Sequence, residues 1–235
     1  MIQVKRGGLT PVDDMMRCAA MRLALILLTS LLVASCVPRG AIPGREGRPA
    51  AQSLDANHPM TLQCRADLAR ERVEFRTVPD RLNENGCSVL GAVQLTDIGT
   101  PSAGLGPMKC PLARQYARWV RDIVQPAARQ LLASPVARIE TFGTYACRPV
   151  NGREGARLSE HGLANAVDVA GFTLEDGRRV SVLDGWNGSD ERVRTFLRTA
   201  HRGGCTLFQV SMGPESNALH RDHLHFDLGQ GRYCR

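Results

Sequence analysis

The sequence has little of what nucleic-acid-binding proteins use. Only two lysines, Lys5 and Lys109, occur among the 30 basic residues, and aromatic residues make up 5% of the chain. The arginines are spread along the chain rather than gathered in a run, although the net charge is +7. Grooves for nucleic acids combine basic side chains with stacked aromatic rings. We therefore expect no nucleic-acid partner, and the dispersed charge suits an anionic polymer or a membrane surface.

The chain also lacks an apolar run long enough to cross a membrane as a mature helix. Its longest such run, residues 23–34, follows Arg17 and Arg22. A spanning helix needs about 20 apolar residues, whereas a short run behind basic residues is typical of a signal peptide. The run ends in Val-Ala-Ser-Cys, which resembles a bacterial lipobox, and in such signals the cysteine, here Cys36, becomes the lipidated first residue. The alternative is cleavage after a small residue, with Cys36 incidental.

These features predict three parts of the chain. Residues 1–36 form the signal segment with the lipobox, residues 37–60 form a flexible tether, and residues 61–235 form the folded domain. The tether is rich in Pro, Gly, Arg and Ala and has no periodicity. Val37 stands where known lipoproteins carry an Asp for retention in the inner membrane. We therefore expect export to the periplasm and anchoring in the outer membrane through lipid on Cys36.

The predicted domain has no cysteines at the close spacings that are typical of metal sites. Of the eight cysteines in the chain, six follow the leader: Cys64, Cys87, Cys110, Cys147, Cys205 and Cys234. No two of them lie within four residues of each other, which argues against a cysteine-ligated metal. An even number in an exported chain indicates disulfides, which can pair in many ways. Our expectation is sequential pairing: Cys64–Cys87, Cys110–Cys147 and Cys205–Cys234.

The secondary structure alternates irregularly between helices and short strands, without internal repeats, which indicates an α+β fold. A helix opening at Pro111 should be kinked at Pro126, and a second helix should run from an N-cap at Ser189 to about His201. The first helix carries an apolar stripe at three- and four-residue spacing: Leu112, Tyr116, Trp119, Ile123, Ala127 and Leu131. Strands are expected at residues 73–78, 88–95, 136–145, 167–172, 180–183, 206–212 and 223–228.

Two histidines separated by one residue stand in the last predicted strand. Side chains alternate along a strand, so His223, His225 and Asp227 share one face, while Leu224 and Phe226 point to the core. One polar face and one apolar face suit a strand that lines a cleft. The alternative is a solvent-facing strand whose histidines occur by chance.

A second motif upstream makes chance a weaker explanation. His161 and Asp168 lie seven residues apart, and together with His225 they would offer two imidazoles and one carboxylate. That ligand set suits zinc, and three protein ligands leave a fourth position for water, as in catalytic rather than structural zinc sites.

The two motifs together resemble the signature of the LAS metallopeptidases, named for lysostaphin, D-alanyl-D-alanine peptidases and hedgehog. Ser159, His161, Ala166 and Asp168 match it at the right spacing, and Ala164 stands where Gly is usual. The resemblance implies a hedgehog/D-Ala-D-Ala-peptidase-like fold, with a small antiparallel sheet and flanking helices, here stapled by disulfides. It also implies one Zn²⁺ held by His161, Asp168 and His225.

Further site residues follow from the same resemblance. His223 is then a candidate general base or oxyanion stabiliser, and His220 either orients the attacking water or supports a residue that contacts the metal. A His at the position of His220 resembles the penicillin-insensitive murein endopeptidases, whereas D-Ala-D-Ala peptidases carry a Glu there. Arg148 would grip a substrate carboxylate or carbonyl, and its alternative role is a structural ion pair. Asp227 would orient a ligand histidine.

A resemblance that covers most of residues 60–235 is to the bacterial extensin-like C-terminal domain family. It is carried by Gly143-x-Tyr145-x-Cys147-Arg148, the run from Asp168 to Phe172, Trp186 and the terminal Tyr233-Cys234. Taken together, these features predict a zinc peptidase acting on peptidoglycan stem peptides or cross-links. The alternatives are a non-catalytic envelope or peptidoglycan-binding protein that retains a zinc site, and a metal hydrolase acting on another amide or ester.

Overall fold

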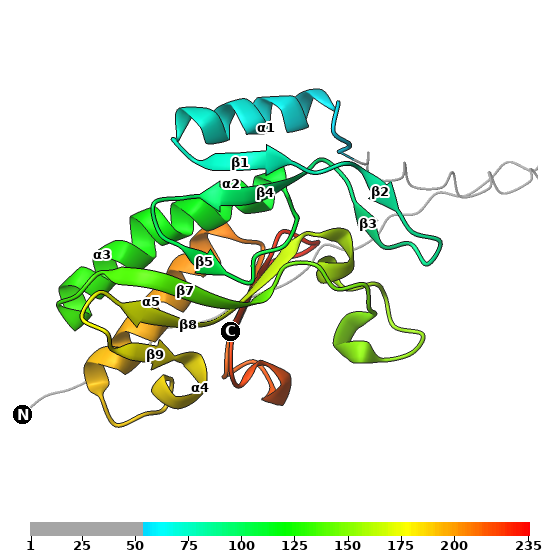
Figure 1. Cartoon of the computed structure of the whole chain (residues 1–235). Coiled ribbons are helices and arrows are strands. Elements are labelled where there is room, and N and C mark those ends of the chain that lie inside the picture. The colour runs from blue at the N-terminus through cyan, green and yellow to red at the C-terminus, as the bar shows by residue number, and fades with distance from the viewer. Residues whose placement is uncertain (1–53) are drawn as a thin grey trace, which may run out of the picture. The chain divides into compact units, whose positions relative to one another are not determined.

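The structure is a computed structural model that describes residues 54–235 (Figure 1). The predicted signal segment with Cys36, and residues 37–53 of the predicted tether, lie outside the described residues. Within residues 54–235, no helix is both long and apolar enough to cross a membrane.

Helices and short strands alternate along the described chain. The helices are α1 (Pro59–Arg70), α2 (Cys110–Trp119), η1 (Val120–Val124), α3 (Gln125–Ala127), η2 (Ala128–Leu132), η3 (Val150–Gly152), η4 (Glu160–Leu163), α4 (Val182–Gly185), α5 (Glu191–Leu207) and η5 (Ala218–His220). The strands are β1 (Glu74–Thr77), β2 (Arg81–Leu82), β3 (Ser88–Val89), β4 (Ala92–Asp97), β5 (Ser102–Ala103), β6 (Met108–Lys109), β7 (Val136–Gly143), β8 (Ala166–Leu174), β9 (Arg179–Ser181), β10 (Val210–Met212), β11 (Leu224–Asp227) and β12 (Tyr233–Cys234).

A seven-stranded sheet forms the centre of the domain. Its strand order is β12-β10-β11-β8-β7-β5, with β9 paired to β8. The long pairings β7–β8, β8–β11 and β10–β11 are antiparallel, and only the short pairings β5–β7 and β10–β12 are parallel. A second sheet, β1-β4-β6, is antiparallel throughout. The predicted α+β class and antiparallel sheet are thus confirmed, with two short parallel pairings at the edges.

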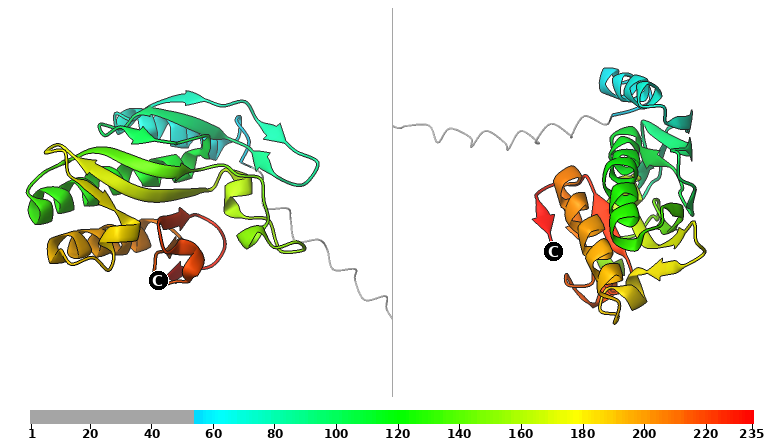
Figure 2. Two further views of the ribbon diagram at one scale, coloured as in Figure 1. Left: turned by 60° about the horizontal axis from the view of Figure 1, so that its bottom comes forward. Right: turned by 90° about the vertical axis from the view of Figure 1, so that its left-hand side faces the viewer.

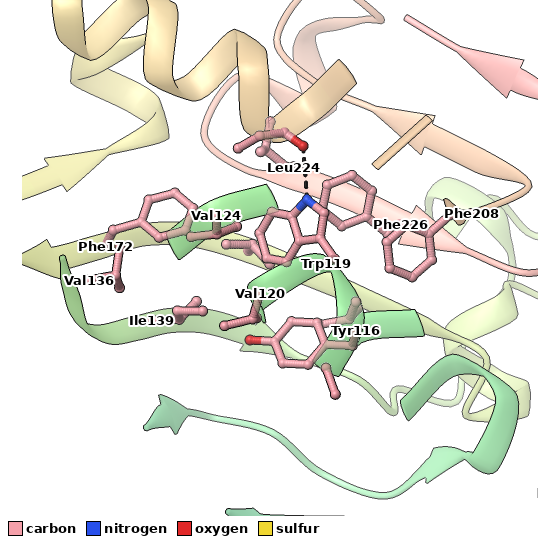
Figure 3. Packing of buried hydrophobic residues seen from close by; sticks show 14 of the residues in the cluster. Tyr116, Trp119, Val120, Val124, Val136, Ile139, Phe172, Phe208, Leu224 and Phe226 are labelled. Carbon is pink, nitrogen blue, oxygen red and sulfur yellow. Dashed lines mark hydrogen bonds between the residues drawn. The ribbon is translucent and has the colours of Figure 1, made fainter. Parts of the chain in front are cut away.

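The helical segment from α2 to η2 lies side by side with α5 on one face of the large sheet (Figures 1 and 2). Trp119 is fully buried between them, and its indole N–H donates a hydrogen bond to the carbonyl of Ala200 at 2.9 Å (Figure 3). Phe226 of β11 packs against the same ring, with centroids 5.1 Å apart. The apolar face of β11 therefore points to the helices, as strand alternation predicts.

The apolar stripe of the first long helix shifts along its length. Its predicted members Ile123 and Leu131 are only partly buried, whereas Val120, Val124 and Leu132 are fully buried. The cause is that η1 and η2 are π-helical. A π-helical turn contains more residues than an α-helical turn, so residues spaced four apart stay on the face that points to the core. Pro126, the predicted kink site, lies between these two wide turns and lacks the N–H that a regular helix would use.

Helix α1 is a feature that the sequence patterns did not reveal. It begins at Pro59, and the ring of His58 caps it by accepting a hydrogen bond from the N–H of Met60. The preceding residues also contact the domain, since Ala56 N–H donates to the carboxylate of Asp80 at 2.7 Å. Residues just before α1 are therefore held against the folded domain.

An ion cluster joins α1 to α2. The Glu71 carboxylate, at the C-terminus of α1, accepts hydrogen bonds from Arg114 at 2.6 and 2.8 Å and from Arg118 at 2.7 Å. Burial alone would raise the pKa of Glu71, but the hydrogen bonds from Arg118 and Arg114 outweigh it and hold the pKa below its ordinary value. The deprotonated carboxylate thus helps to dock α1.

Two other sequence predictions are corrected at the C-terminal half. The N-cap of α5 is Asp190 rather than Ser189, because the Asp190 carboxylate accepts from the N–H groups of Arg192 and Val193. Helix α5 continues to Leu207, past the predicted end near His201, and so takes the first residues of the strand expected at 206–212.

Three disulfides staple the domain, as predicted, but the sequential pairing is wrong for two of them. The bonds join Cys64 to Cys110, Cys87 to Cys147, and Cys205 to Cys234. The missed helix α1 explains the first error, because it carries Cys64 back against the start of α2, where Cys110 lies. Cys87, in the β2–β3 hairpin, is then left to pair with the loop that follows β7.

Candidate metal centre

Three elements bring the predicted ligands together. His161 lies in η4, Asp168 in β8 and His225 in β11, and Asp168 and His225 are partners in the antiparallel ladder. Helix η4 is capped at its start by Ser159, whose hydroxyl accepts from the His161 N–H, and at its end by Ala164. Ala164 has φ +52°, in the left-handed region where glycine is favoured.

The ligand atoms converge at close spacing. His161 Nε2 lies 3.1 Å from an oxygen of Asp168 and 3.2 Å from His225 Nδ1, and His225 Nδ1 lies 2.8 Å from the other Asp168 oxygen. Tetrahedral ligands about 2.0–2.1 Å from a zinc ion stand about 3.3 Å from one another. The two imidazoles and the carboxylate therefore fit a zinc ion with little movement.

The remaining nitrogens of both histidines are hydrogen-bonded. His161 Nδ1 lies 3.3 Å from the carbonyl of Thr144, and His225 Nε2 lies 2.8 Å from the carboxylate of Asp227. An N–H at each of these positions donates, which leaves His161 Nε2 and His225 Nδ1 as lone-pair donors. Asp227 thus contacts His225, one of the predicted ligands, and is itself held by the N–H of Gly229 at 2.7 Å.

The cluster favours positive charge at its centre. Burial alone would raise the pKa of Asp168, but hydrogen bonds from His161 and His225 lower it far below its ordinary value. Burial alone would lower the pKa of His225, yet Asp168 and Asp227 raise it to about 9. Two buried carboxylates around one imidazole therefore call for a cation, either a proton or a metal ion.

A cavity of about 360 Å³ opens onto the cluster. His161, Asp168 and His225 form its floor and are each at least nine-tenths buried. This volume lies within the range of small-molecule sites, and it gives the cluster an open side.

A family model agrees with the extent of this domain. The family described as extensin-like protein C-terminus matches residues 62–235, which is most of the chain. The chain belongs to this family. No curated protein and no solved structure was found to match it. The family description names no reaction, so the activity of this extensin-like domain has to be argued from its site.

Both other predicted histidines line the same cavity of the extensin-like domain. The Nδ1 of His223 lies 2.9 Å from Asp222, and its Nε2 lies 3.6 Å from Asp168. His220 lies in η5, with Nδ1 2.9 Å from Asn217 and its ring centroid 5.0 Å from that of His223. Burial and the neighbouring His225 and His223 lower the pKa of His220 to about 4, so its ring is neutral near pH 7.

Arg148 reaches the cavity from a fastened loop. The disulfide at Cys147 and the hydrogen bond from Ser159 N–H to the Arg148 carbonyl hold its backbone. Within residues 54–235, the salt bridges involve other arginines, and Arg148 has no carboxylate partner. Arg157, which also lines the cavity, lies 3.9 Å from Glu160. Two exposed guanidinium groups thus border the opening.

A second grouping, of His201, Cys205 and Cys234, is not a candidate metal centre in this state. Its two sulfurs are joined in a disulfide and cannot ligate as thiolates. His201 itself is 6% exposed and packs edge-on against Trp186.

The cavity surroundings also contain groups that the sequence patterns missed. Leu219 lines the opening while 57% exposed, and Phe142 stands edge-on against His223 with ring centroids 5.7 Å apart. Neither residue belongs to a motif, and a single apolar residue near the end of a strand gives no signal of its own.

Proposed function

We propose that this protein is a zinc-dependent amide hydrolase, of the LAS metallopeptidase type, that acts on peptidoglycan stem peptides or cross-links. The observation that carries the proposal is the convergence of His161 Nε2, an Asp168 oxygen and His225 Nδ1 on the floor of an open cavity. Zinc bound there would lower the pKa of a water molecule towards about 7 and polarise the scissile carbonyl.

His223 is the proposed general base. Its Nδ1–H donates to Asp222, which leaves Nε2 free to accept a proton from the attacking water. The same nitrogen lies 3.6 Å from Asp168, so it is close to whatever the cluster holds. After attack, the imidazolium would give its proton to the leaving amine. The neutral His220, with Nδ1–H on Asn217, offers its other nitrogen as an acceptor that orients the water.

Arg148 and Arg157 are the proposed anchors for the substrate. Peptidoglycan stem peptides carry free carboxylates, and a guanidinium group binds a carboxylate with two parallel hydrogen bonds. Both arginines border the cavity. A carboxylate held there would place the neighbouring amide over the metal cluster.

The proposed location follows from the leader and the disulfides. Stable disulfides are typical of oxidising compartments such as the periplasm, and the domain has three. We therefore place the domain in the periplasm, tethered to the outer membrane by lipid on Cys36, with peptidoglycan as its partner.

Metal content tests the ligand assignment directly. The mature chain should contain about one zinc ion, and the ion should be lost in His161→Ala. His58→Ala removes a histidine that caps α1 far along the chain from the ligands, and should keep the metal. His223→Ala should also keep the metal but lose sacculus digestion. Full zinc occupancy in His161→Ala would refute the assignment.

The hydrogen bonds of His225 also support a second candidate function, that of a non-catalytic protein that binds peptidoglycan. His225 is bonded to a carboxylate at each nitrogen, so a protonated ring satisfies the cluster without a metal. Such a protein would bind sacculi and release no product. If product does appear, mass spectrometry distinguishes cleaved peptides from the release of another amide or ester substituent.

A further inference from the structure

We infer that Phe142 forms a second substrate subsite, beside the metal cluster, for a hydrocarbon face of the substrate such as a sugar ring or the methylene stem of a side chain. The inference deepens the proposed function and rests on it for the identity of the substrate.

Phe142 is an apolar residue that is exposed rather than buried in the core. It is 63% exposed, and it lies near the end of β7, next to Gly143, whose ladder partner is Asp168. Its ring meets the edge of His223, the proposed base. An exposed aromatic ring one side chain away from the reacting groups is a typical ligand-contacting feature.

A separate cavity of about 270 Å³ lies along this ring. Its lining includes Phe142, Ala170 and the polar residues Glu140, Arg179 and Ser181. His223 lines the first cavity and its ring packs against that of Phe142, which lines the second. This ring contact links the linings of the two cavities.

The strands give the spacing between the metal cluster and this subsite. Ala170 lies two residues after Asp168 along β8. On the neighbouring antiparallel strand β7, Glu140 lies opposite Gly171, and is therefore displaced from Asp168 towards the same end of the sheet as Ala170. A strand advances about 3.3 Å per residue, so the backbone of Ala170, in the lining of the second cavity, lies about 7 Å along β8 from that of Asp168. That separation suits a group one or two chain units away from the scissile amide.

The two cavities differ in chemistry, and this difference predicts the orientation in which the substrate binds. Arg148 and Arg157 border the first cavity and suit a carboxylate. The second offers an apolar ring bordered by a carboxylate, a guanidinium and a hydroxyl, which suits a hydrocarbon face edged with hydrogen-bonding groups. The carboxylate-bearing part of the substrate then lies over the arginines, and the hydrocarbon-rich part lies over Phe142.

Binding measurements with two probes test the subsite. The probes are the amino-sugar disaccharide of peptidoglycan and its free stem peptide, each titrated against the mature zinc-loaded protein. The variants are Phe142→Ala, Phe142→Trp and the control Leu183→Ala, which removes a side chain that is 54% exposed and lines neither cavity. Because Phe142 is exposed, truncation should leave the melting temperature nearly unchanged.

We expect the Kd of at least one probe to rise about three- to tenfold in Phe142→Ala, to stay close to wild type in Phe142→Trp, and to be unaffected by Leu183→Ala. The probe that responds identifies the group, either sugar or side chain. Unchanged binding of both probes in Phe142→Ala, or no binding of either probe to the wild type, overturns the subsite. So does a lower kcat with unchanged Kd, since Phe142 would then only position His223.

Failure of the subsite and failure of the proposed function give different results. Sacculus digestion that proceeds with no effect of Phe142→Ala on Kd or KM removes the subsite and leaves the hydrolase. Phe142-dependent binding without any released product supports the subsite and removes the hydrolase.

Discussion

Replacing Asp227 by Asn should weaken zinc binding about 10–100-fold without unfolding the domain. The Asp227 carboxylate accepts a hydrogen bond from His225 Nε2 at 2.8 Å and is 5% exposed. It therefore fixes the orientation of the ring and makes the lone pair of Nδ1 more basic, which strengthens its bond to zinc. Asn keeps the shape but removes the charge. The expected loss of binding free energy is about 1.4–2.7 kcal/mol.

Competition with a chromogenic chelator measures this change. Asp222→Asn is the matched control, because Asp222 contacts His223 rather than a ligand, and its affinity for zinc should be unchanged. Urea denaturation of the metal-free proteins separates a loss of fold from a loss of metal. Equal zinc affinity in Asp227→Asn and wild type would refute the reasoning that Asp227 acts through His225.

Three further predictions concern the fold. Trp119→Phe should cost about 1–3 kcal/mol in urea denaturation, because it removes the buried indole N–H that donates to the Ala200 carbonyl and leaves part of the core unfilled, whereas Trp186→Phe should cost less, since the Trp186 indole N–H has no partner within the described residues. Glu71→Gln should lose about 1 kcal/mol at pH 7. Since the folded pKa of Glu71 is lowered, its stabilisation is present above the ordinary value near 4.5 and is lost as the pH falls through the folded value, so the difference between wild type and variant should shrink as the pH is lowered below 4.5 in the same assay. A non-reducing peptide map should contain a Cys64–Cys110 cross-link, and opening this loop of 46 residues by Cys64→Ser with Cys110→Ser should cost about 4 kcal/mol; a Cys64–Cys87 cross-link would contradict the fold.

The sequence was sufficient to predict which face of the last long strand carries the polar side chains. Strand alternation places His225 and Asp227 on the face opposite Phe226, and the structure has this arrangement. What alternation could not provide is the register that pairs His225 with Asp168, because register depends on contacts between strands far apart in the chain.

Other features were beyond local patterns for identifiable reasons. Helix α1 buries only Thr61, Cys64 and Leu68, so its apolar periodicity is weak, and missing it also led to the wrong cysteine pairing. The shift of the buried stripe to Val124 comes from π-helical turns, and the spacing of apolar residues does not predict such turns. The role of Phe142 depends on a neighbour 81 positions away along the chain, His223, and therefore only on the folded structure.

The first two disulfides interleave, because Cys87 lies inside the loop closed by Cys64 and Cys110 while its own partner, Cys147, lies outside it. On the proposed export route the chain emerges from its N-terminal end, so Cys64 and Cys87 meet an oxidant before Cys110 has appeared. The first bond formed there would be a non-native one, and reaching the native set requires thiol–disulfide exchange. Maturation of this domain should therefore depend on a disulfide isomerase as well as on an oxidant, and the yield of the native protein should fall in cells that lack one.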